Sequence, residues 1–142
     1  MVYISHEKQF IIQQSLSDFR VIRNNEERLT VDDYNQIHAE SRLFLEEALK
    51  NKTDIPTVAI THHPPTFVNY PEKYANSTIN EAFGTEMFNF IEESEIDYWI
   101  YGHHHCNISD FTVGKTKLVT NQLGYIKYNE NENFRRDAVF SI

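Results

Sequence analysis

Two short apolar segments that each run into histidines constrain this sequence most. Residues 55–61 (IPTVAIT) and 96–102 (IDYWIYG) are apolar on both sides, as expected of strands buried inside a sheet. The histidines that follow them are His62, His63, His103, His104 and His105. Because these are five of the seven histidines in the chain, their shared position at strand ends needs an explanation.

Two helices are predicted around these strands. Thr30 begins the first, with Asp33 as its capping-box partner, and Thr78 with Glu81 begins the second. Apolar residues recur at helical spacing in both, and this spacing predicts the buried face of each helix. The first face comprises Tyr34, Ile37, Ser41, Phe44, Leu45, Ala48 and Leu49, and the second comprises Ile79, Ala82, Phe83, Met87, Phe90 and Ile91.

The remaining segments complete an α/β pattern. Residues 8–22 are rich in Phe and Ile and predict one or two strands. Residues 108–126 predict a hairpin that turns at Gly114, and residues 137–142 predict a terminal strand. We therefore expect a single α/β domain over residues 1–142, in which helices pack on a mixed sheet.

The strands predicted at 55–61 and 96–102 are connected by a helix, so they should run parallel and end at the same edge of the sheet. Ligands bind at that edge in open α/β sheets, and imidazole is a common ligand of first-row divalent metals. In an extended segment, residues i and i+2 point the same way. We therefore expect His103 and His105 to face one site and His104 to face away. Gly102 would allow the backbone to approach a ligand closely.

A less specific interpretation competes with a metal site. A single histidine is usually a half-exposed polar residue, and we expect this of His6 and His38. The pair His62 and His63, followed by two prolines, could be the start of a stiff loop. Convergence with the second histidine cluster favours metal binding. The zincin pattern and zinc-finger Cys/His spacing are absent from the sequence.

Composition limits the partners. The chain has 21 acidic and 13 basic residues, a net charge of −8, and no dense Lys/Arg cluster, so we expect no nucleic-acid groove. An acidic protein that handles phosphate would use bound cations to offset the charge. The lone Cys106 cannot form an internal disulfide, and neither a signal peptide nor a membrane span is evident. We therefore expect a cytoplasmic protein with no membrane partner.

The order of these motifs carries a family resemblance. TVAITHHPP (57–65) followed by DYWIYGHHHCN (97–107) resembles the C-terminal half of a calcineurin-like metallophosphoesterase, in the bacterial predicted-phosphohydrolase branch. The segments 38–49, 73–87 and 121–125 (NQLGY) resemble that branch too. The resemblance implies one half of a metallophosphoesterase-type α/β sandwich and hydrolysis of a phosphoester substrate, including phosphorylated small molecules.

The resemblance also implies roles for individual residues. His62 and His103 match the ligands of the second metal, and His105 matches a ligand of the first. Three other residues lie in family motifs and are candidates for substrate binding or for supporting the metal ligands: His63, His104 and Asn80. The implied cofactors are two divalent transition metal ions, of manganese, iron or zinc, in the complete enzyme.

The chain departs from the family in its acidic ligands. The Asp-x-His, Gly-Asp-x-x-Asp and Gly-Asn-His-Asp/Glu motifs of the family are absent from the sequence. Three imidazoles without a carboxylate would hold two dications poorly, so we expect one ion or none in this chain alone, and no turnover. One hypothesis is a phosphoesterase portion that lacks the N-terminal motifs. The alternative is an inactive binding or interaction module. An uncovered apolar sheet face predicts a homo-oligomer.

Overall fold

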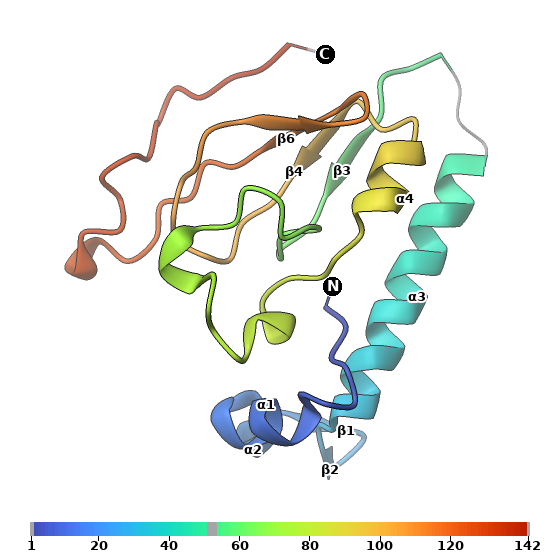
Figure 1. Cartoon of the computed structure of the whole chain (residues 1–142), viewed down its shortest axis with the longest axis vertical. Coiled ribbons are helices and arrows are strands. Elements are labelled where there is room, and N and C mark those ends of the chain that lie inside the picture. The colour runs from blue at the N-terminus through green and yellow to red at the C-terminus, as the bar shows by residue number, and fades with distance from the viewer. Residues whose placement is uncertain (1, 51–53, 142) are drawn as a thin grey trace.

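The computed structural model describes residues 2–50 and 54–141, and within them a mixed sheet lies in the upper part of the molecule as drawn in Figure 1. Its strand order is β3-β4-β6-β5. β4 runs parallel to both β3 and β6, and β5 runs antiparallel to β6. The strands are β3 (Val58–Ile60), β4 (Tyr98–Ile100), β5 (Phe111–Val113) and β6 (Thr116–Val119). The predicted α/β class and the parallel pairing of the two histidine-bearing strands are confirmed.

The predicted hairpin at Gly114 is also confirmed, since this residue connects β5 and β6. Gly114 has a φ of 56°, in the left-handed region that favours glycine. A Cβ atom here would lie 2.7 Å from the backbone oxygen of Glu92. Both backbone conformation and the nearby α4 therefore require glycine at this turn.

One face of the sheet is covered by helices. Trp99 and Leu118 are fully buried on this face, together with Ile91 of α4 (Phe88–Glu93). The second half of α3 (Val31–Lys50) adds Leu45 and Leu49 to this cluster. Burying a large apolar side chain in this way stabilises the fold by about 1.5–3 kcal/mol.

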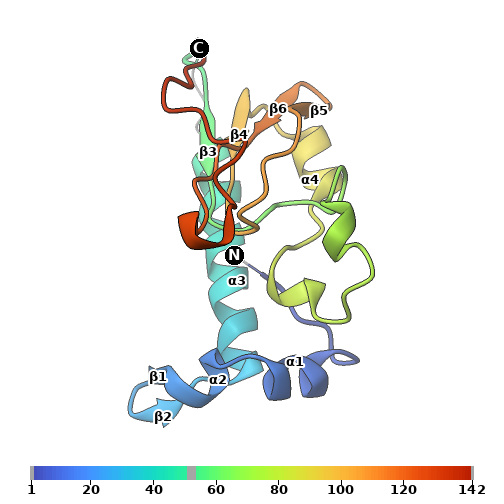
Figure 2. The same ribbon diagram turned by 90° about the vertical axis from the view of Figure 1, so that its left-hand side faces the viewer.

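The opposite face meets the C-terminal segment, so the strands lie between α4 and that segment in Figure 2. The ring of Phe140 stacks on Tyr98 at 4.7 Å, and the Tyr98 hydroxyl donates to the backbone oxygen of Ser141 at 3.0 Å. The strand predicted at 137–142 is wrong over the described residues 137–141, which form no strand. Side-chain contacts with the sheet face, rather than pairing with a sheet edge, hold this segment.

The strands predicted at 8–22 are wrong. This segment forms α1 (Gln9–Ser15) and α2 (Asp18–Val21), followed by a short hairpin of β1 (Arg23–Asn24) and β2 (Glu27–Arg28). Ile12, Leu16 and Phe19 are spaced as i, i+4 and i+7, and they pack into a second apolar cluster beside the start of α3. Helical spacing, not Phe and Ile content, was the informative signal.

The start predicted for α3 is confirmed, because Thr30 and Asp33 form a capping box. The Thr30 N–H donates to Asp33 Oδ2 at 2.8 Å, and the Asp33 N–H donates to Thr30 Oγ1 at 3.1 Å. The buried face predicted for α3 is partly wrong, because Ile37, Phe44 and Ala48 are exposed.

Polar side chains take inner positions on α3 instead. Asn35 donates to and accepts from the backbone of Ile4, with both distances 2.8 Å. His38, expected to be half-exposed, is buried and contacts the ring of Tyr3 at 5.8 Å. His6 is exposed. Packing against the N-terminal residues therefore rotates the buried face away from the apolar stripe.

The helix predicted from Thr78 is wrong in its extent. A single 3-10 turn covers Asn80–Ala82, and α4 begins only at Phe88. Between them, the N–H groups of Thr85 and Met87 donate to the backbone oxygens of Pro64 and Pro65, at 3.2 and 2.9 Å. These bonds to the loop after β3 replace helical ones. Two further 3-10 turns cover Glu72–Tyr74 and Ile126–Tyr128.

Over the described ranges 2–50 and 54–141, no helix has the length and apolar character needed to cross a lipid bilayer.

Candidate metal centre

The loops after β3 and β4 are hydrogen-bonded to each other. The Thr61 N–H donates to the Ile100 oxygen at 3.0 Å, and the Gly102 N–H donates to the His62 oxygen at 3.0 Å. The indole N–H of buried Trp99 donates to Thr61 Oγ1 at 3.0 Å. The parallel register thus continues past the strand ends and brings the two histidine segments side by side.

Three histidines converge at this edge. Nitrogen atoms of His62, His63 and His103 all lie within 4.8 Å of one another. His103 Nδ1 lies 3.0 Å from His62 Nε2. Phe83 stacks on the His103 ring with centroids 5.1 Å apart, which fixes one side of the cluster.

The imidazoles of His63 and His103 are in the charge state that a metal requires. Burial, helped by the neighbouring histidines, lowers the pKa of His63 to about 3 and that of His103 to about 4. Both rings are therefore neutral at pH 7. Nitrogen ligands about 2.1 Å from one tetrahedral ion lie roughly 3.4 Å from one another. The observed spacing fits such an ion after small side-chain rotations.

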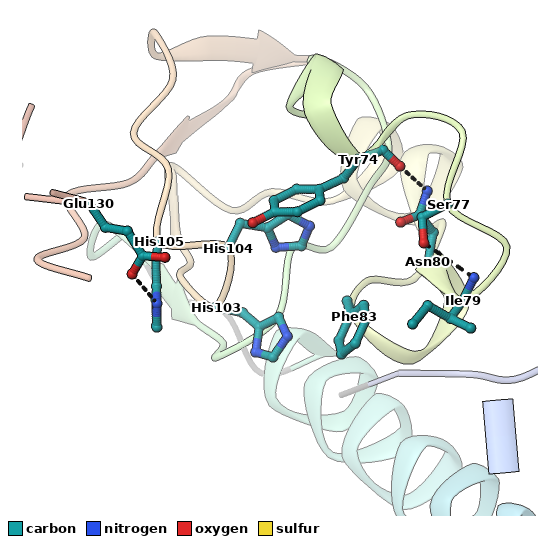
Figure 3. A pocket seen from close by; sticks show the side chains of 9 residues that line it. All are labelled: Tyr74, Ser77, Ile79, Asn80, Phe83, His103, His104, His105 and Glu130. Carbon is teal, nitrogen blue, oxygen red and sulfur yellow. Dashed lines mark hydrogen bonds and ion pairs between the residues drawn. The ribbon is translucent and has the colours of Figure 1, made fainter. Parts of the chain in front are cut away.

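The structure places His105 outside this group. Its Nδ1 lies 2.9 Å from Glu130 Oε2, and Figure 3 shows this pair on the far side of His104 from Phe83. The extended backbone assumed for residues 103–105 is wrong, since φ is 77° at His103 and 48° at His105. Alternation of side chains along a strand does not apply to this bend.

Two residues that the sequence did not point to, Glu130 and Gln122, hold His105 in place. Glu130 also accepts the Tyr125 N–H at 2.6 Å, which lowers the pKa of this carboxyl group, and His105 lowers it further. The Gln122 side-chain oxygen accepts the His105 N–H at 2.7 Å. Gln122 lies inside the recognised NQLGY motif and could have been suspected. Glu130, 25 residues from His105, has no local signal.

Gly124 is the glycine whose missing side chain makes room inside the fold, whereas the space beside Gly102 is not crowded by protein atoms. A Cβ at Gly102 would lie 3.6 Å from the His62 oxygen, an ordinary contact. A Cβ at Gly124 would lie 2.5 Å from Glu130 Cβ and 3.1 Å from His105 Cβ. Gly124 also has a φ of 63°. The NQLGY turn therefore packs directly behind His105.

His104 is buried apart from the cluster. The rings of Tyr70 and Tyr74 contact its ring edge to face, at 4.6 and 5.2 Å. Burial lowers the pKa of His104 to about 4. Its Nδ1 is buried and has no hydrogen-bond partner among the residues that the structure describes.

Asn80 stabilises the loop that carries Tyr74. Its Nδ2 donates to the Tyr74 oxygen at 2.7 Å, and its Oδ1 accepts the Tyr70 hydroxyl at 3.4 Å. Asn80 thus lies close to the histidines, while its own amide is engaged within the loop.

Comparison with known proteins identifies the family of this chain. The family model of calcineurin-like phosphoesterases matches residues 2–107, which include all five histidines of the two loops. A similar curated protein is an uncharacterized protein of Acanthamoeba polyphaga mimivirus, 34% identical over 150 residues. The match covers 98% of this chain and 52% of the viral protein, so the chain spans about half of that relative's length. No solved structure matches the chain significantly. The match over most of its length shows that the chain belongs to the calcineurin-like phosphoesterase family.

Proposed function

We propose that this chain supplies the histidine side of a metal-dependent phosphoester hydrolase site. The observation that carries the proposal is the convergence of His62, His63 and His103 at the carboxyl ends of two parallel strands. A divalent ion there would act as a Lewis acid toward a phosphate oxygen. Manganese, iron and zinc all suit imidazole ligands.

The residues have distinct parts in this proposal. His62 and His103 would hold one ion, and His63, which lies within reach of both, would join them or orient a phosphate oxygen. His105 holds the other ion of the complete site. Glu130 keeps the His105 ring in place, as carboxylates do for many metal-binding histidines.

We propose that the acidic ligands come from a second unit outside these 142 residues. A two-metal site needs carboxylates to offset the charge and to bridge the ions, and the family motifs that would supply them are absent from this sequence. That the chain spans about half of its viral relative is consistent with such a unit.

Metal binding by the isolated chain tests the first step. Zinc titration in a calorimeter should give about one weak site, which the double variant His62→Ala/His103→Ala loses. His6→Ala, at an exposed histidine, is the matched control. Unchanged zinc binding in the double variant contradicts the proposed cluster.

Activity tests the second step. We expect the isolated chain to hydrolyse p-nitrophenyl phosphate no faster than metal-containing buffer. Fusion or co-expression with an N-terminal half that carries the missing motifs should restore chelator-sensitive hydrolysis, and His105→Ala should abolish it. If zinc binds but such fusions remain inactive, the chain is a binding module. Robust turnover by the chain alone contradicts the half-site.

A further inference from the structure

A cavity of about 300 Å³ opens beside the histidines. Its apolar wall consists of Tyr74, Ile79 and Phe83, and its remaining wall includes His103, His104 and Glu130. Figure 3 shows Tyr74 and Phe83 on two sides of this space, with His104 between them. The cavity therefore adjoins the candidate metal centre and shares His103 with it.

The polar groups of the loop around the cavity are largely engaged within the protein. The Asn80 amide bonds to Tyr74 and Tyr70, and the Ser77 hydroxyl accepts the Ile79 N–H at 3.4 Å. The cavity must therefore recognise a ligand mainly by its shape and by ring contacts, rather than by many hydrogen bonds. Such apolar walls with few polar groups are typical of sites for small organic ligands.

The lining of the cavity favours an uncharged occupant over an anionic one. Neither lysine nor arginine occurs among the described residues that line the cavity. The Glu130 carboxylate lines the cavity, and its Oε2 lies 2.9 Å from His105 Nδ1. A second phosphate group would meet an unfavourable field here, whereas an uncharged ring would not.

His104 gives the cavity a further ring contact. It lines the cavity, is only 7% exposed, and its ring meets that of Tyr74 edge to face at 5.2 Å. An aromatic occupant can extend these ring contacts.

We infer that this cavity receives the organic group of the substrate and selects phosphoesters of an uncharged aromatic ring. The inference rests on the proposed function, since the phosphate must lie at the histidine cluster. Phe83 links the two parts, because its ring stacks on His103 and also lines the cavity. The volume of about 300 Å³ accommodates one or two fused rings.

The test compares two phosphonates with the same charged head on the zinc-loaded 142-residue chain, followed by NMR. Phenylphosphonate should bind about three- to tenfold more tightly than methylphosphonate, the typical effect of one aromatic contact. Its binding should shift the signals of Tyr74 and His104. Tyr74→Ala and Phe83→Leu should each reduce this preference, and Tyr74→Ala should do so without weakening methylphosphonate binding. Phe10→Leu, at an exposed ring on α1, is the control.

Equal binding of the two phosphonates, or a preference that survives both cavity variants, overturns the inference. Phe83→Leu keeps an apolar side chain of similar size, and the backbone spectrum shows whether each variant is folded. A further experiment on the metal-free chain compares the NMR shifts caused by benzyl alcohol with those caused by cyclohexanol. It separates the cavity inference from the metal proposal. Zinc binding without aryl preference refutes only the cavity inference. Absence of zinc binding with selective shifts by benzyl alcohol refutes only the metal proposal.

Discussion

Glu130 accepts a backbone N–H from Tyr125 and also contacts His105 Nδ1. Its pKa is lowered, so the carboxyl group is ionised and can only accept hydrogen bonds. Nδ1 of His105 must therefore carry the proton. In the neutral ring, this leaves the lone pair on Nε2. One carboxylate thus selects the tautomer that presents Nε2 to a metal.

Glu130→Gln should remove this selection, because an amide can both donate and accept. Nitrogen NMR of the His105 ring should show mainly the Nδ1–H tautomer in the parent chain and a mixture in the variant. In the fused enzyme, metal affinity or activity should fall about 10- to 100-fold. Glu132→Gln, at an exposed neighbour, is the control. An unchanged tautomer in Glu130→Gln contradicts this role.

His38 and His104 are buried as neutral rings, and burial lowers the pKa of each below the ordinary value of 6.5. The unfolded chain therefore binds more protons below pH 6.5 than the folded chain does. Stability is fully present above about pH 6.5 and falls as the pH drops below it, by at most about 1.4 kcal/mol per pH unit for each proton.

Urea unfolding of the metal-free chain between pH 7.5 and 5 should show this loss of stability. His38→Gln should make the free energy of unfolding less dependent on pH, because one buried imidazole is gone. His6→Gln, at an exposed histidine, serves as the comparison. If the two variants have equal slopes, buried His38 is not a source of the pH dependence.

At the scale of elements, the same Thr-x-x-acid pattern has two outcomes. Thr30 and Asp33 form reciprocal bonds at the start of α3, a 20-residue helix. Glu81 instead accepts the Ser5 N–H at 2.7 Å, so Thr78 has no capping partner there. Glu86 accepts the Phe88 N–H at 2.9 Å and thereby satisfies the start of α4. Tertiary contacts compete with local caps and decide between them.

Thr30→Ala should therefore lower the free energy of unfolding by about 1 kcal/mol, the usual effect of losing an N-cap. Thr78→Ala is the matched variant, and it should change stability by less than about 0.5 kcal/mol because Thr78 is exposed and caps no helix. Urea denaturation with a common slope measures both. Equal losses in the two variants would rule out a specific capping contribution from Thr30.

At the scale of the whole molecule, the sheet is covered unequally. Ile60, Ile100 and Val119 lie in register on the face opposite the helices. The C-terminal segment covers the Tyr98 end of this face, and Ile60 remains 74% exposed. Ile100 and Val119 are half-buried beside it, and an apolar patch that stays partly exposed on a sheet face can mark an interface. In the proposed complete enzyme, the second unit would cover this face.

The isolated chain should therefore associate with its own copies through this face. Light scattering at increasing concentration should show dimers or larger species, and Ile60→Lys should shift the population toward monomer. Leu43→Lys, at an exposed position on α3, should leave the association unchanged. A strictly monomeric parent chain at high concentration contradicts the prediction.

Local sequence by itself determined the secondary-structure elements that position the site. The strands before His62 and His103, the hairpin at Gly114 and the cap at Thr30 follow from short-range patterns. The predicted burial of the first strand on both faces is wrong, because β3 lies at the edge of the sheet and Ile60 is exposed. Each depends on apolar content, a backbone conformation or a cap within a few residues. Parallel pairing then placed both histidine loops at one edge of the sheet.

Only the tertiary structure decided which histidines meet. The bend at residues 103–105 turns His105 toward Glu130, and the loop contact brings His63 to His62 and His103. Segment 8–22 is helical because its spaced apolar side chains pack beside α3, and the second predicted helix is interrupted because its backbone bonds to Pro64 and Pro65. These outcomes depend on side-chain directions and on partners distant in sequence, which local periodicity does not specify.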